Sequence, residues 1–405
     1  MKKLLFVDDD PRVLEALQQG LRSQESQWEI AFAPGGEAAL AFLEASPFDV
    51  IISDMRMPGM DGAELLKRVR DRHPDMLRIV CATPAELDAT LRAVPFAHQF
   101  LVKPCELDAL RVAIGRAGSL FEVLNHDLLA RIVGPTQGLP SLPRVYSALQ
   151  DAVADPNVSL DKVARIVEQD IAISAKTLQL VNSALFALRR NITSVRTAVS
   201  YIGITVLKQL ILSAEVFRVF KDSDAVDGFS LEDLYAHSQL TARIAGAMNA
   251  AQYVPEAPVV ASLLHDVGKL VLATRLPNQF AAILKQAQEQ ERPLHEVEQE
   301  VLGLSHAEIG AGLLGLWGLP CVIVEAVAHH HNPTRVPHEK LDTIGAVYIA
   351  NCLAAKHPIR SGDGMIHSPM DMEYVTEIGA AKYLPEWEAL AKSAAQELAA
   401  ASIGG

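Results

Sequence analysis

The first 120 residues alternate short apolar runs with helical patterns, and this alternation constrains the fold more than any other feature of the chain. Apolar runs of strand length occupy residues 4–7, 28–33, 49–54, 78–82 and 100–103. Strands that alternate with helices predict a doubly wound parallel α/β sheet. Because a chain of 405 residues exceeds one typical core, we expect a second domain after this sheet.

Charged side chains stand at the ends of the predicted strands. Asp8, Asp9 and Asp10 end the first strand, Asp54 ends the third, and Lys103 ends the last. The carboxyl ends of parallel strands meet at one edge of the sheet, so we expect these side chains to converge. Carboxylates so close together repel one another unless a cation lies between them. The pattern predicts a Mg²⁺ site, where the cation could also neutralise a phosphoryl group on one carboxylate.

This segment resembles the receiver domain of two-component response regulators. The resemblance is carried by VDDD at 7–10, SDMRMPGMDG at 53–62 and KP at 103–104. It implies a flavodoxin-like fold whose Asp54 accepts a phosphoryl group from a cognate sensor histidine kinase.

The same resemblance implies a role for each charged residue at the strand ends. Asp8 and Asp9 would bind Mg²⁺ together with Asp54, and the carbonyl of Arg56 would complete that site. Lys103 would contact the phosphoryl oxygens. Asp10 is the weaker member of the set and could simply start a helix.

One position departs from the receiver pattern. Receivers carry Ser or Thr at the end of the fourth strand, where the hydroxyl follows the phosphoryl group, but here Ala82 occupies that position. Thr83 follows one residue later and could contact the phosphoryl group after a local shift. We therefore expect phosphorylation to be retained and its coupling to the output to be weakened.

Composition narrows the set of partners. The chain has 49 Asp and Glu against 36 Lys and Arg, so we expect no nucleic-acid partner, because phosphate binding needs clustered Lys and Arg. The apolar run of MKKLLFV stops at Asp8, too early for a signal peptide, and no segment offers the roughly 20 apolar residues of a membrane span. The four cysteines form no CxxC pair. We predict a cytoplasmic protein with no membrane role.

Residues 106–133 keep apolar side chains at helical spacing, which predicts a helix that continues into a connector. Gly134-Pro135 then breaks the pattern. We predict four segments: a receiver domain at 1–121, a helical connector at 122–138, a second domain at 139–335 and a C-terminal helical extension at 336–405. Because a long amphipathic connector usually packs on a partner helix, we expect a homodimer.

From residue 139 onward the apolar spacing is helical almost throughout, and this predicts an all-α bundle without a strong strand pattern. Six of the 13 histidines are candidates for one site, each group on a separate predicted helix or helix end: His237, His265, His306, His329, His330 and His331. A bundle can bring such side chains together in its core, where Asp266 adds a carboxylate. Imidazole and carboxylate ligands suit Fe, Mn, Zn or Ni better than Ca²⁺.

This second domain resembles the HDOD domain, a relative of the HD phosphohydrolases. The resemblance is carried by several motifs in order: GLPSLPRVYSALQ at 138–150, the run at 173–203, HDVGKL at 265–270, the run at 302–320 and VAHHHNP at 327–333. HDOD domains are regarded mainly as output modules without catalytic activity. The resemblance therefore implies a domain that binds a downstream signalling protein.

The HD pattern implies two metal sites. The first would be formed by His237, His265 and Asp266, and the second by His306, His329 and His330, as in the branch that hydrolyses cyclic dinucleotides. Lys269 resembles a lysine that acts near the substrate phosphate, although it could equally be a cation at a helix end. We interpret His331 and His338 as surface residues.

Two departures separate the chain from the HD enzymes. The late aspartate of the pattern is replaced by Asn351, within AVYIANCLA at 346–354, and NPTRVP at 332–337 replaces the GYP-type loop. Asn351 is a neutral and weaker metal ligand. These departures favour an output module that binds partner proteins, while the retained histidines favour the alternative, a phosphorylation-controlled metal-dependent phosphohydrolase of cyclic dinucleotides or nucleotides.

Overall fold

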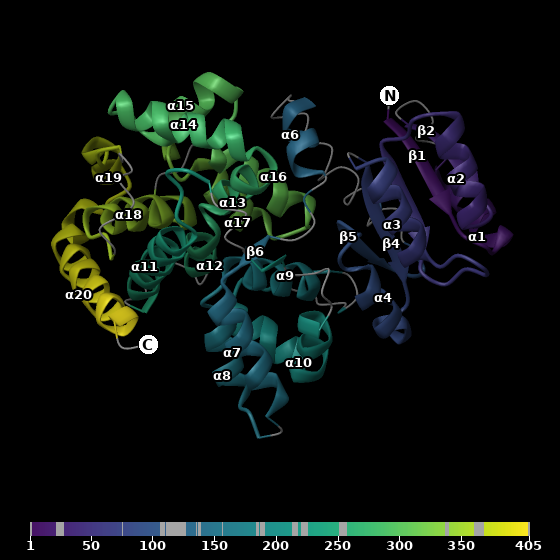
Figure 1. Cartoon of the computed structure of the whole chain (residues 1–405), viewed down its shortest axis with the longest axis horizontal. Coiled ribbons are helices and arrows are strands. Elements are labelled where there is room, and N and C mark those ends of the chain that lie inside the picture. Colours follow the sequence, from purple (N-terminus) through teal and green to yellow (C-terminus); the bar gives the residue numbers. More distant parts are fainter. Residues whose placement is uncertain are drawn as a thin grey trace.

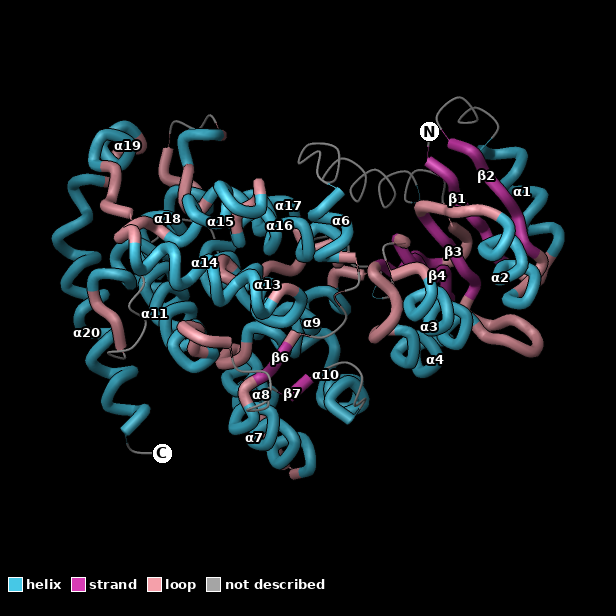
Figure 2. Tube along the Cα trace, turned by 45° about the horizontal axis from the view of Figure 1, so that its top comes forward, coloured by secondary structure: helices cyan, strands magenta, loops and turns pink. Residues whose placement is uncertain are grey.

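The structure is a computed structural model in which the α/β part and the helical part lie side by side (Figures 1 and 2). It describes the chain except residues 1, 22–27, 75, 106–109, 111–126, 135, 137–138, 156, 184–185, 187–190, 213–217, 220–225, 251–256, 337–339, 360–367 and 404–405. Most of the predicted last helix of the first domain lies outside the described residues, as do residues 122–126, 135 and 137–138 of the connector and His338.

The first domain is built on a five-stranded parallel sheet in the order β2-β1-β3-β4-β5, which confirms the predicted fold class. Its strands are β1 (Lys2–Val7), β2 (Trp28–Ala33), β3 (Val50–Asp54), β4 (Leu77–Ala82) and β5 (Gln99–Val102). Every residue of β3 and β4 is buried, which explains why both read as continuous apolar runs rather than alternating ones. Asp54, the phosphoacceptor candidate, is the last residue of β3 and lies opposite Cys81 of β4. It therefore lies at the carboxyl edge of the sheet.

Helices cover this sheet. They are α1 (Pro11–Leu21), α2 (Gly36–Ala45), α3 (Gly62–Arg72) and α4 (Leu87–Ala93), the last preceded by the short helix η2 (Pro84–Glu86). Asp61 begins α3 by accepting a hydrogen bond from the Glu64 backbone N–H, 2.9 Å away. Consecutive helices among α2, α3 and α4 contact each other.

Among its described residues the second domain has helices and one short parallel strand pair, β6 (Pro140–Ser141) and β7 (Arg218–Val219), which the apolar spacing did not predict. Its earlier helices are α6 (Asp127–Val133), α7 (Pro143–Ala154), α8 (Leu160–Val167), α9 (Ile171–Val181), α10 (Val195–Leu212), α11 (Leu231–Ala250) and α12 (Ala257–Leu264). The next are α13 (Val267–Arg275), α14 (Pro277–Glu289), α15 (Leu294–Leu302), α16 (His306–Leu316), α17 (Cys321–His329) and η5 (Pro333–Arg335). The last are α18 (Thr343–Lys356), α19 (Met372–Glu377), η6 (Ala381–Tyr383) and α20 (Leu384–Ile403).

The C-terminal helices pack on the same bundle. Helix α11 contacts both α18 and α20, and a buried cluster around Trp387 joins the three. Among the described residues, Ala257–Arg275 is the one stretch long and apolar enough to cross a membrane, and 89% of its apolar window is buried. Since this stretch contains His265 and Asp266, burial places the pair in the core of the bundle.

A buried polar junction connects the two domains. The Gln99 side-chain amide on β5 donates to the carbonyl of Leu316 at 3.2 Å, and the Gln179 side-chain amide on α9 donates to the carbonyl of His98 at 3.0 Å. Arg78 donates from Nη2 to the carbonyl of Gly134 at 3.2 Å. The edge strand of the sheet is thereby tied to the end of α16, a helix that begins at His306.

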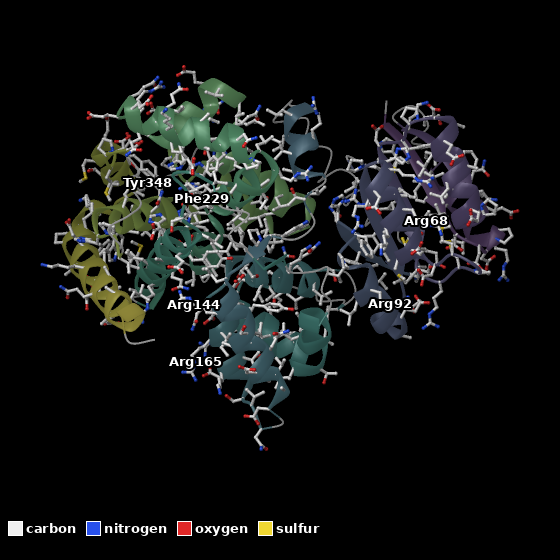
Figure 3. All side chains as sticks on the ribbon, viewed as in Figure 1. Arg68, Arg92, Arg144, Arg165, Phe229 and Tyr348 are labelled. Atoms are coloured by element: carbon white, nitrogen blue, oxygen red, sulfur yellow. The ribbon has the colours of Figure 1, made fainter. Side chains whose placement is uncertain are left out.

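The exposed basic side chains are distributed over both domains (Figure 3). Arg68 and Arg92 lie on the α/β domain, and Arg165 lies on α8 of the helical domain. Each pairs with a carboxylate: Arg68 with Glu64 at 2.9 Å, Arg92 with Asp61 at 3.0 Å and Arg165 with Asp161 at 2.7 Å. The positive charge of each of these three arginines is therefore balanced by a carboxylate of the same chain.

Candidate functional site

The sheet edge brings the predicted acidic residues together. Potential ligand oxygens of Asp8, Asp9 and Asp54 lie within 4.8 Å of one another. Lys103 Nζ lies 2.7 Å from Asp8 Oδ2 and 2.8 Å from Asp54 Oδ1. Asp8 and Asp54 are buried, whereas Asp9 is exposed. The group matches what a hard divalent cation and an incoming phosphoryl group require: oxygen ligands and one fixed ammonium.

The charges of this edge depend on one another. Burial raises the pKa of Asp54 because the ionised form loses hydration, and the hydrogen bond from Lys103 works against this effect. Burial alone would lower the pKa of Lys103, but hydrogen bonds to Asp54 and Asp8 raise it above its ordinary value. Lys103 therefore stays charged and holds Asp54 in its nucleophilic, ionised form.

Four neighbouring residues have distinct surroundings. Arg56 turns its guanidinium to Glu86, with Nε 3.3 Å from Oε1, and its carbonyl stays a predicted ligand. Asp10 accepts from the Arg12 backbone N–H at 2.9 Å, as a residue that starts α1 does. Ala82 is buried at the end of β4. Thr83 lines the cavity that also contains Asp54 and Lys103.

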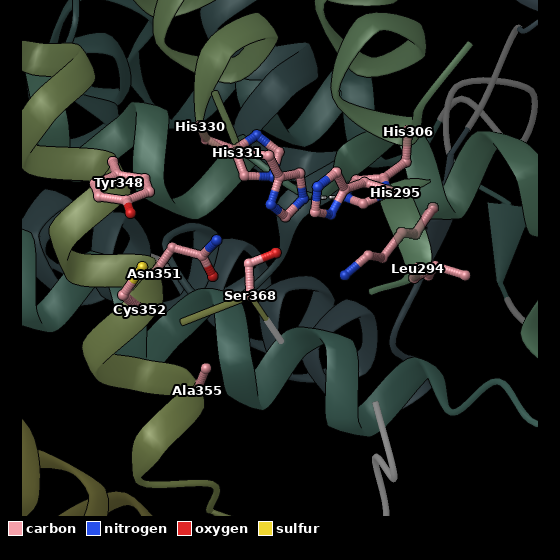
Figure 4. A pocket seen from close by; sticks show the side chains of 11 residues that line it. Leu294, His295, His306, His330, His331, Tyr348, Asn351, Cys352, Ala355 and Ser368 are labelled. Atoms are coloured by element: carbon pink, nitrogen blue, oxygen red, sulfur yellow. Dashed lines mark hydrogen bonds between the residues drawn. The ribbon is translucent and has the colours of Figure 1, made fainter. Parts of the chain in front are cut away.

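A second group of titratable side chains converges inside the helical domain (Figure 4). His237 comes from α11, and His265 and Asp266 come from the turn between α12 and α13. His306 begins α16, His330 and His331 follow α17, and Asn351 lies on α18. Two possible ligand sets share Asp266: one with His237 and His265, the other with His306, His330 and His331.

Asp266 stands at the centre of this cluster. Its Oδ1 lies 3.1 Å from His306 Nε2 and 3.7 Å from His330 Nε2. Its Oδ2 lies 2.8 Å from Lys269 Nζ and 3.3 Å from His265 Nε2. Burial opposes its ionised form, but His265 and Lys269 lower the pKa of Asp266 well below its ordinary value. The aspartate is therefore an anion in the protein interior.

Backbone and carboxylate acceptors set the tautomers of three histidines. Nδ1 of His265 donates to the Ser262 carbonyl at 2.6 Å, and Nδ1 of His330 donates to the Val327 carbonyl at 2.7 Å. Nδ1 of His306 lies 2.6 Å from Glu298 Oε2. When these rings are neutral, the lone pair of each Nε2 faces Asp266, where a metal ion could accept it.

Several atoms at the centre of the cluster have no hydrogen-bond partner, and this observation indicates whether a metal ion would fit there. His265 Nε2, His330 Nε2 and Asp266 Oδ1 are buried without a hydrogen bond. Lone pairs that face one another in the interior are costly unless a cation lies between them. A proton on His306 would also relieve part of the conflict: burial opposes it, but the Glu298 carboxylate raises the pKa of His306. The donor set fits a divalent transition metal.

The structure changes two predictions about the histidine run. His331 is not a surface residue: its Nε2 lies 2.9 Å from His306 Nε2, within the second ligand set. His329, which we predicted as a ligand, is outside both sets. Successive side chains of a helix point about 100° apart. His329 is the last residue of α17 and His330 caps that helix, so the two side chains point in different directions and only His330 points into the cluster. The turn after His330 brings the His331 side chain back toward the cluster.

Two further residues escaped the sequence analysis. Glu298 is fully buried on α15. Its carboxylate accepts hydrogen bonds from the backbone N–H and from the ring Nδ1 of His306. His295 stacks on His331 with ring centroids 4.0 Å apart and lines the pocket beside the cluster (Figure 4). Glu298 precedes His306 by eight residues, but a contact between two helices cannot be inferred from this spacing alone.

Two glycines allow the helices that carry the cluster to cross closely. A Cβ atom on Gly268 would lie 1.9 Å from the His306 carbonyl oxygen, and one on Gly310 would lie 2.9 Å from Val267 Cγ1. Real side chains do not tolerate the first distance. Gly268, within the HDVGK motif, therefore lets α16 place His306 against Asp266.

Asn351 occupies the position of the expected late aspartate. Its Oδ1 lies 2.9 Å from His237 Nε2, so in this arrangement His237 donates its proton to the amide. The same nitrogen lies 3.9 Å from Asp266 Oδ2. A nitrogen that carries a proton cannot ligate a metal, so His237 must release this proton before it can join the first ligand set.

Replacement of Glu298 by Gln is expected to weaken binding of a divalent transition metal by at least about tenfold. The amide cannot accept the His306 Nδ1 proton with a full negative charge, so the basicity and orientation of His306 change. Glu296→Gln is the matched control, because Glu296 is half exposed on the same helix and pairs with Arg292 at 3.6 Å. Titration of Mn²⁺ or Zn²⁺ by calorimetry measures both variants, and equal affinities would contradict the role of Glu298.

Two domain models of known families match separate parts of the chain. The response regulator receiver domain model matches residues 4–115, and the HDOD domain model matches residues 139–333. An uncharacterized protein of Treponema pallidum is 27% identical over 224 residues, which are 55% of this chain and 44% of that protein. The chain spans less than half the length of the first curated relatives that it matches.

Two solved structures are also similar. The MmoQ response regulator of Methylococcus capsulatus is 22% identical with a TM-score of 0.49, covering 62% of this chain and 98% of that chain. The response regulator TrrA of Thermotoga maritima, in complex with Mg²⁺ and BeF, is 31% identical with a TM-score of 0.26, covering 29% of this chain and 98% of that chain. The two matched domain models, the parallel sheet and the helical bundle lead to one conclusion: this chain contains a response regulator receiver domain followed by an HDOD domain.

Proposed function

We propose that the chain is a cytoplasmic phosphorylation switch. A sensor histidine kinase supplies the phosphoryl group, Asp54 accepts it, and the HDOD domain passes the signal to another signalling protein. The observation that carries this proposal is the buried group of Asp8, Asp54 and Lys103 at the strand ends.

In this proposal Mg²⁺ binds at Asp8, Asp9, Asp54 and the Arg56 carbonyl. When bound, the cation neutralises charge on the phosphoryl oxygens. The Asp54 carboxylate attacks phosphorus, the bond between phosphorus and the phosphoryl donor breaks, and Lys103 holds the phosphoryl oxygens that face it. Thr83 is the hydroxyl group closest in sequence to the usual switch position, and it lines the same cavity.

Helix α16 offers a route from the sheet to the histidine cluster. Its last residue, Leu316, accepts the hydrogen bond from Gln99 on β5, and its first residue, His306, faces Asp266. The helix has 11 residues and spans about 16 Å. A shift of β5 on phosphorylation would thus move His306 relative to Asp266 without any intervening loop.

The Ala82→Thr variant is expected to strengthen the response to phosphorylation. A hydroxyl at the end of β4 could bond to the phosphoryl group directly, whereas Thr83 must first shift. Small-angle X-ray scattering of the full chain with and without beryllofluoride, a phosphoryl mimic, measures the change in domain arrangement and dimerisation. Thr83→Ala is the partner variant and should abolish any response that remains in the parent.

The outcomes separate the possible routes. A larger change in Ala82→Thr than in the parent supports the proposal. Identical profiles for the parent and both variants, with the mimic bound, would show that the phosphoryl group does not act through this strand end. Homodimerisation, which we propose from the amphipathic connector, is measured in the same experiment.

The second candidate function is a phosphohydrolase controlled by the receiver. It is favoured by the pocket beside the cluster, which is lined by Lys269, His306, His330 and His331. Lys269 is buried and bound to Asp266, so it could hold a substrate phosphate only after that ion pair opens. Asn351 weighs against catalysis, because it lowers the negative charge of the cluster and occupies His237.

A further inference from the structure

Two cysteines lie beside the phosphorylation site. Cys81 is on β4 directly opposite Asp54 in the strand register, and its carbonyl accepts the Met55 backbone N–H at 3.1 Å. Cys105 follows Lys103 by two residues, at the end of β5. Both thiols line the cavity that contains Asp54 and Lys103. Neither belongs to the set of residues expected to bind Mg²⁺ or the phosphoryl group.

The two thiols are neighbours and differ in exposure. Both side chains line one cavity, each shifts the pKa of the other, and both thiols are free rather than joined. Cys81 is 5% exposed, whereas Cys105 is half-buried. Neighbouring thiols can close a disulfide after side-chain rotation and a small backbone adjustment. The chain thus holds a paired dithiol with one accessible member.

The surroundings of Cys105 suit it for the role of attacking thiol. The hydrogen bond from Cys81 lowers the pKa of Cys105; burial opposes this shift, and the nearby Lys103 ammonium adds to it. The buried neighbour, Cys81, is then the resolving thiol. Reactive cysteines that sense oxidants typically combine partial exposure, a nearby cation and a second cysteine.

We propose that Cys81 and Cys105 are a redox-sensitive pair that a peroxide converts to an intramolecular disulfide beside the phosphorylation site. The Cys105 thiolate attacks one peroxide oxygen, the O–O bond breaks, and the leaving oxygen departs as water after taking a proton. The resulting sulfenic acid is attacked by the Cys81 sulfur, the S–O bond breaks, and a second water leaves. Two thiols are oxidised and one peroxide is reduced to two waters.

The disulfide would restrain the Lys103 segment. It would join the end of β4 to a residue two positions after Lys103, whose ammonium must move with the phosphoryl group. We therefore expect the oxidised chain to accept a phosphoryl group from acetyl phosphate several-fold more slowly. This effect on phosphorylation rests on the proposed function, but the formation of the disulfide does not.

Intact-mass measurement of the full chain after treatment with hydrogen peroxide tests the pair. The expected result is a loss of about 2 Da that dithiothreitol reverses, with peptide mapping that joins Cys81 to Cys105. Cys105→Ser should abolish this loss. Cys105→Ala should abolish it as well, and both variants leave the buried Cys81 unchanged. Cys321→Ser is the matched control, because Cys321 is exposed in the other domain and should leave the loss unchanged.

Three results would overturn the proposal: no loss of mass in the parent, a loss that persists in Cys105→Ser, or a disulfide that joins other cysteines. Phosphorylation is measured separately on the reduced and the oxidised parent. If the reduced chain is not phosphorylated, the proposed function fails while the disulfide still forms. If the oxidised chain is phosphorylated as fast as the reduced chain, the disulfide does not restrain Lys103.

Discussion

Asp54→Asn is expected to abolish phosphorylation of the chain. Incubation of the parent with acetyl phosphate and Mg²⁺ should add about 80 Da, the mass of one phosphoryl group, and the variant should gain nothing. The reason is geometric as well as chemical. Asp54 is buried at a strand end, and its Oδ1 lies 2.8 Å from Lys103 Nζ, the group placed to receive the phosphoryl oxygens. An amide at this position is not a nucleophile.

Two neighbouring aspartates supply the controls. Asp8 also contacts Lys103, at 2.7 Å, but its predicted role is to bind Mg²⁺. Asp8→Asn should therefore slow the reaction and raise the Mg²⁺ concentration that it requires. Asp10→Asn should leave the mass gain intact, since Asp10 is engaged with Arg12 at the start of α1. A full mass gain that survives in Asp54→Asn would place the acceptor elsewhere.

The fold of the receiver domain was predictable because each of its strands is a distinct short apolar run. Residues 50–52 and 79–82 are apolar without alternation, which is how strands buried on both faces appear in a sequence. The carboxyl edge followed from the rule that parallel strands end together, and this rule brought Asp8, Asp54 and Lys103 to one place. Local pattern and topology determine this site almost completely.

The histidine cluster was harder to predict because it depends on contacts between helices. The HDVGK motif identified His265 and Asp266, but the choice between His329 and His331 depends on where α17 ends, and one residue decides it. Glu298 carries no motif, and its role appears only when α15 packs against α16. A spacing pattern gives the face of a helix but not the partner of that face.

The contact between domains could not be predicted at all. Arg78 and His98 are polar residues near the start of β4 and β5, where either would be expected at the surface. Instead both are buried, and Nε2 of His98 lies 3.0 Å from the Gly134 carbonyl. Burial lowers the pKa of His98 well below its ordinary value, so the ring is neutral and donates this bond. Only the assembled chain shows that the sheet edge faces α9 and α16.

Removal of the His265 imidazole is expected to weaken metal binding. In His265→Ala the cluster loses one nitrogen ligand, and Asp266 loses the imidazole beside it. Affinity for Mn²⁺, Fe²⁺ or Zn²⁺ should therefore fall by at least about tenfold. The parent should retain metal below one equivalent, because the amide of Asn351 occupies His237 at 2.9 Å. Mass spectrometry of purified protein for metals measures both. His329→Ala is the matched control, since His329 lies on α17 outside both ligand sets and should keep the parent's metal content.

Asn351→Asp tests what separates this cluster from a hydrolase. The carboxylate adds a negative charge beside His237 and leaves the Nε2 of that ring free to ligate, so metal should bind more tightly than in the parent. We expect the parent not to hydrolyse cyclic dinucleotides, because a weakly held ion orients attacking water poorly. Metal-dependent turnover by the parent would contradict this and establish the hydrolase. Absence of metal from the parent, His265→Ala and Asn351→Asp alike would instead mean that Lys269, together with a proton on His306 held by Glu298, neutralises Asp266.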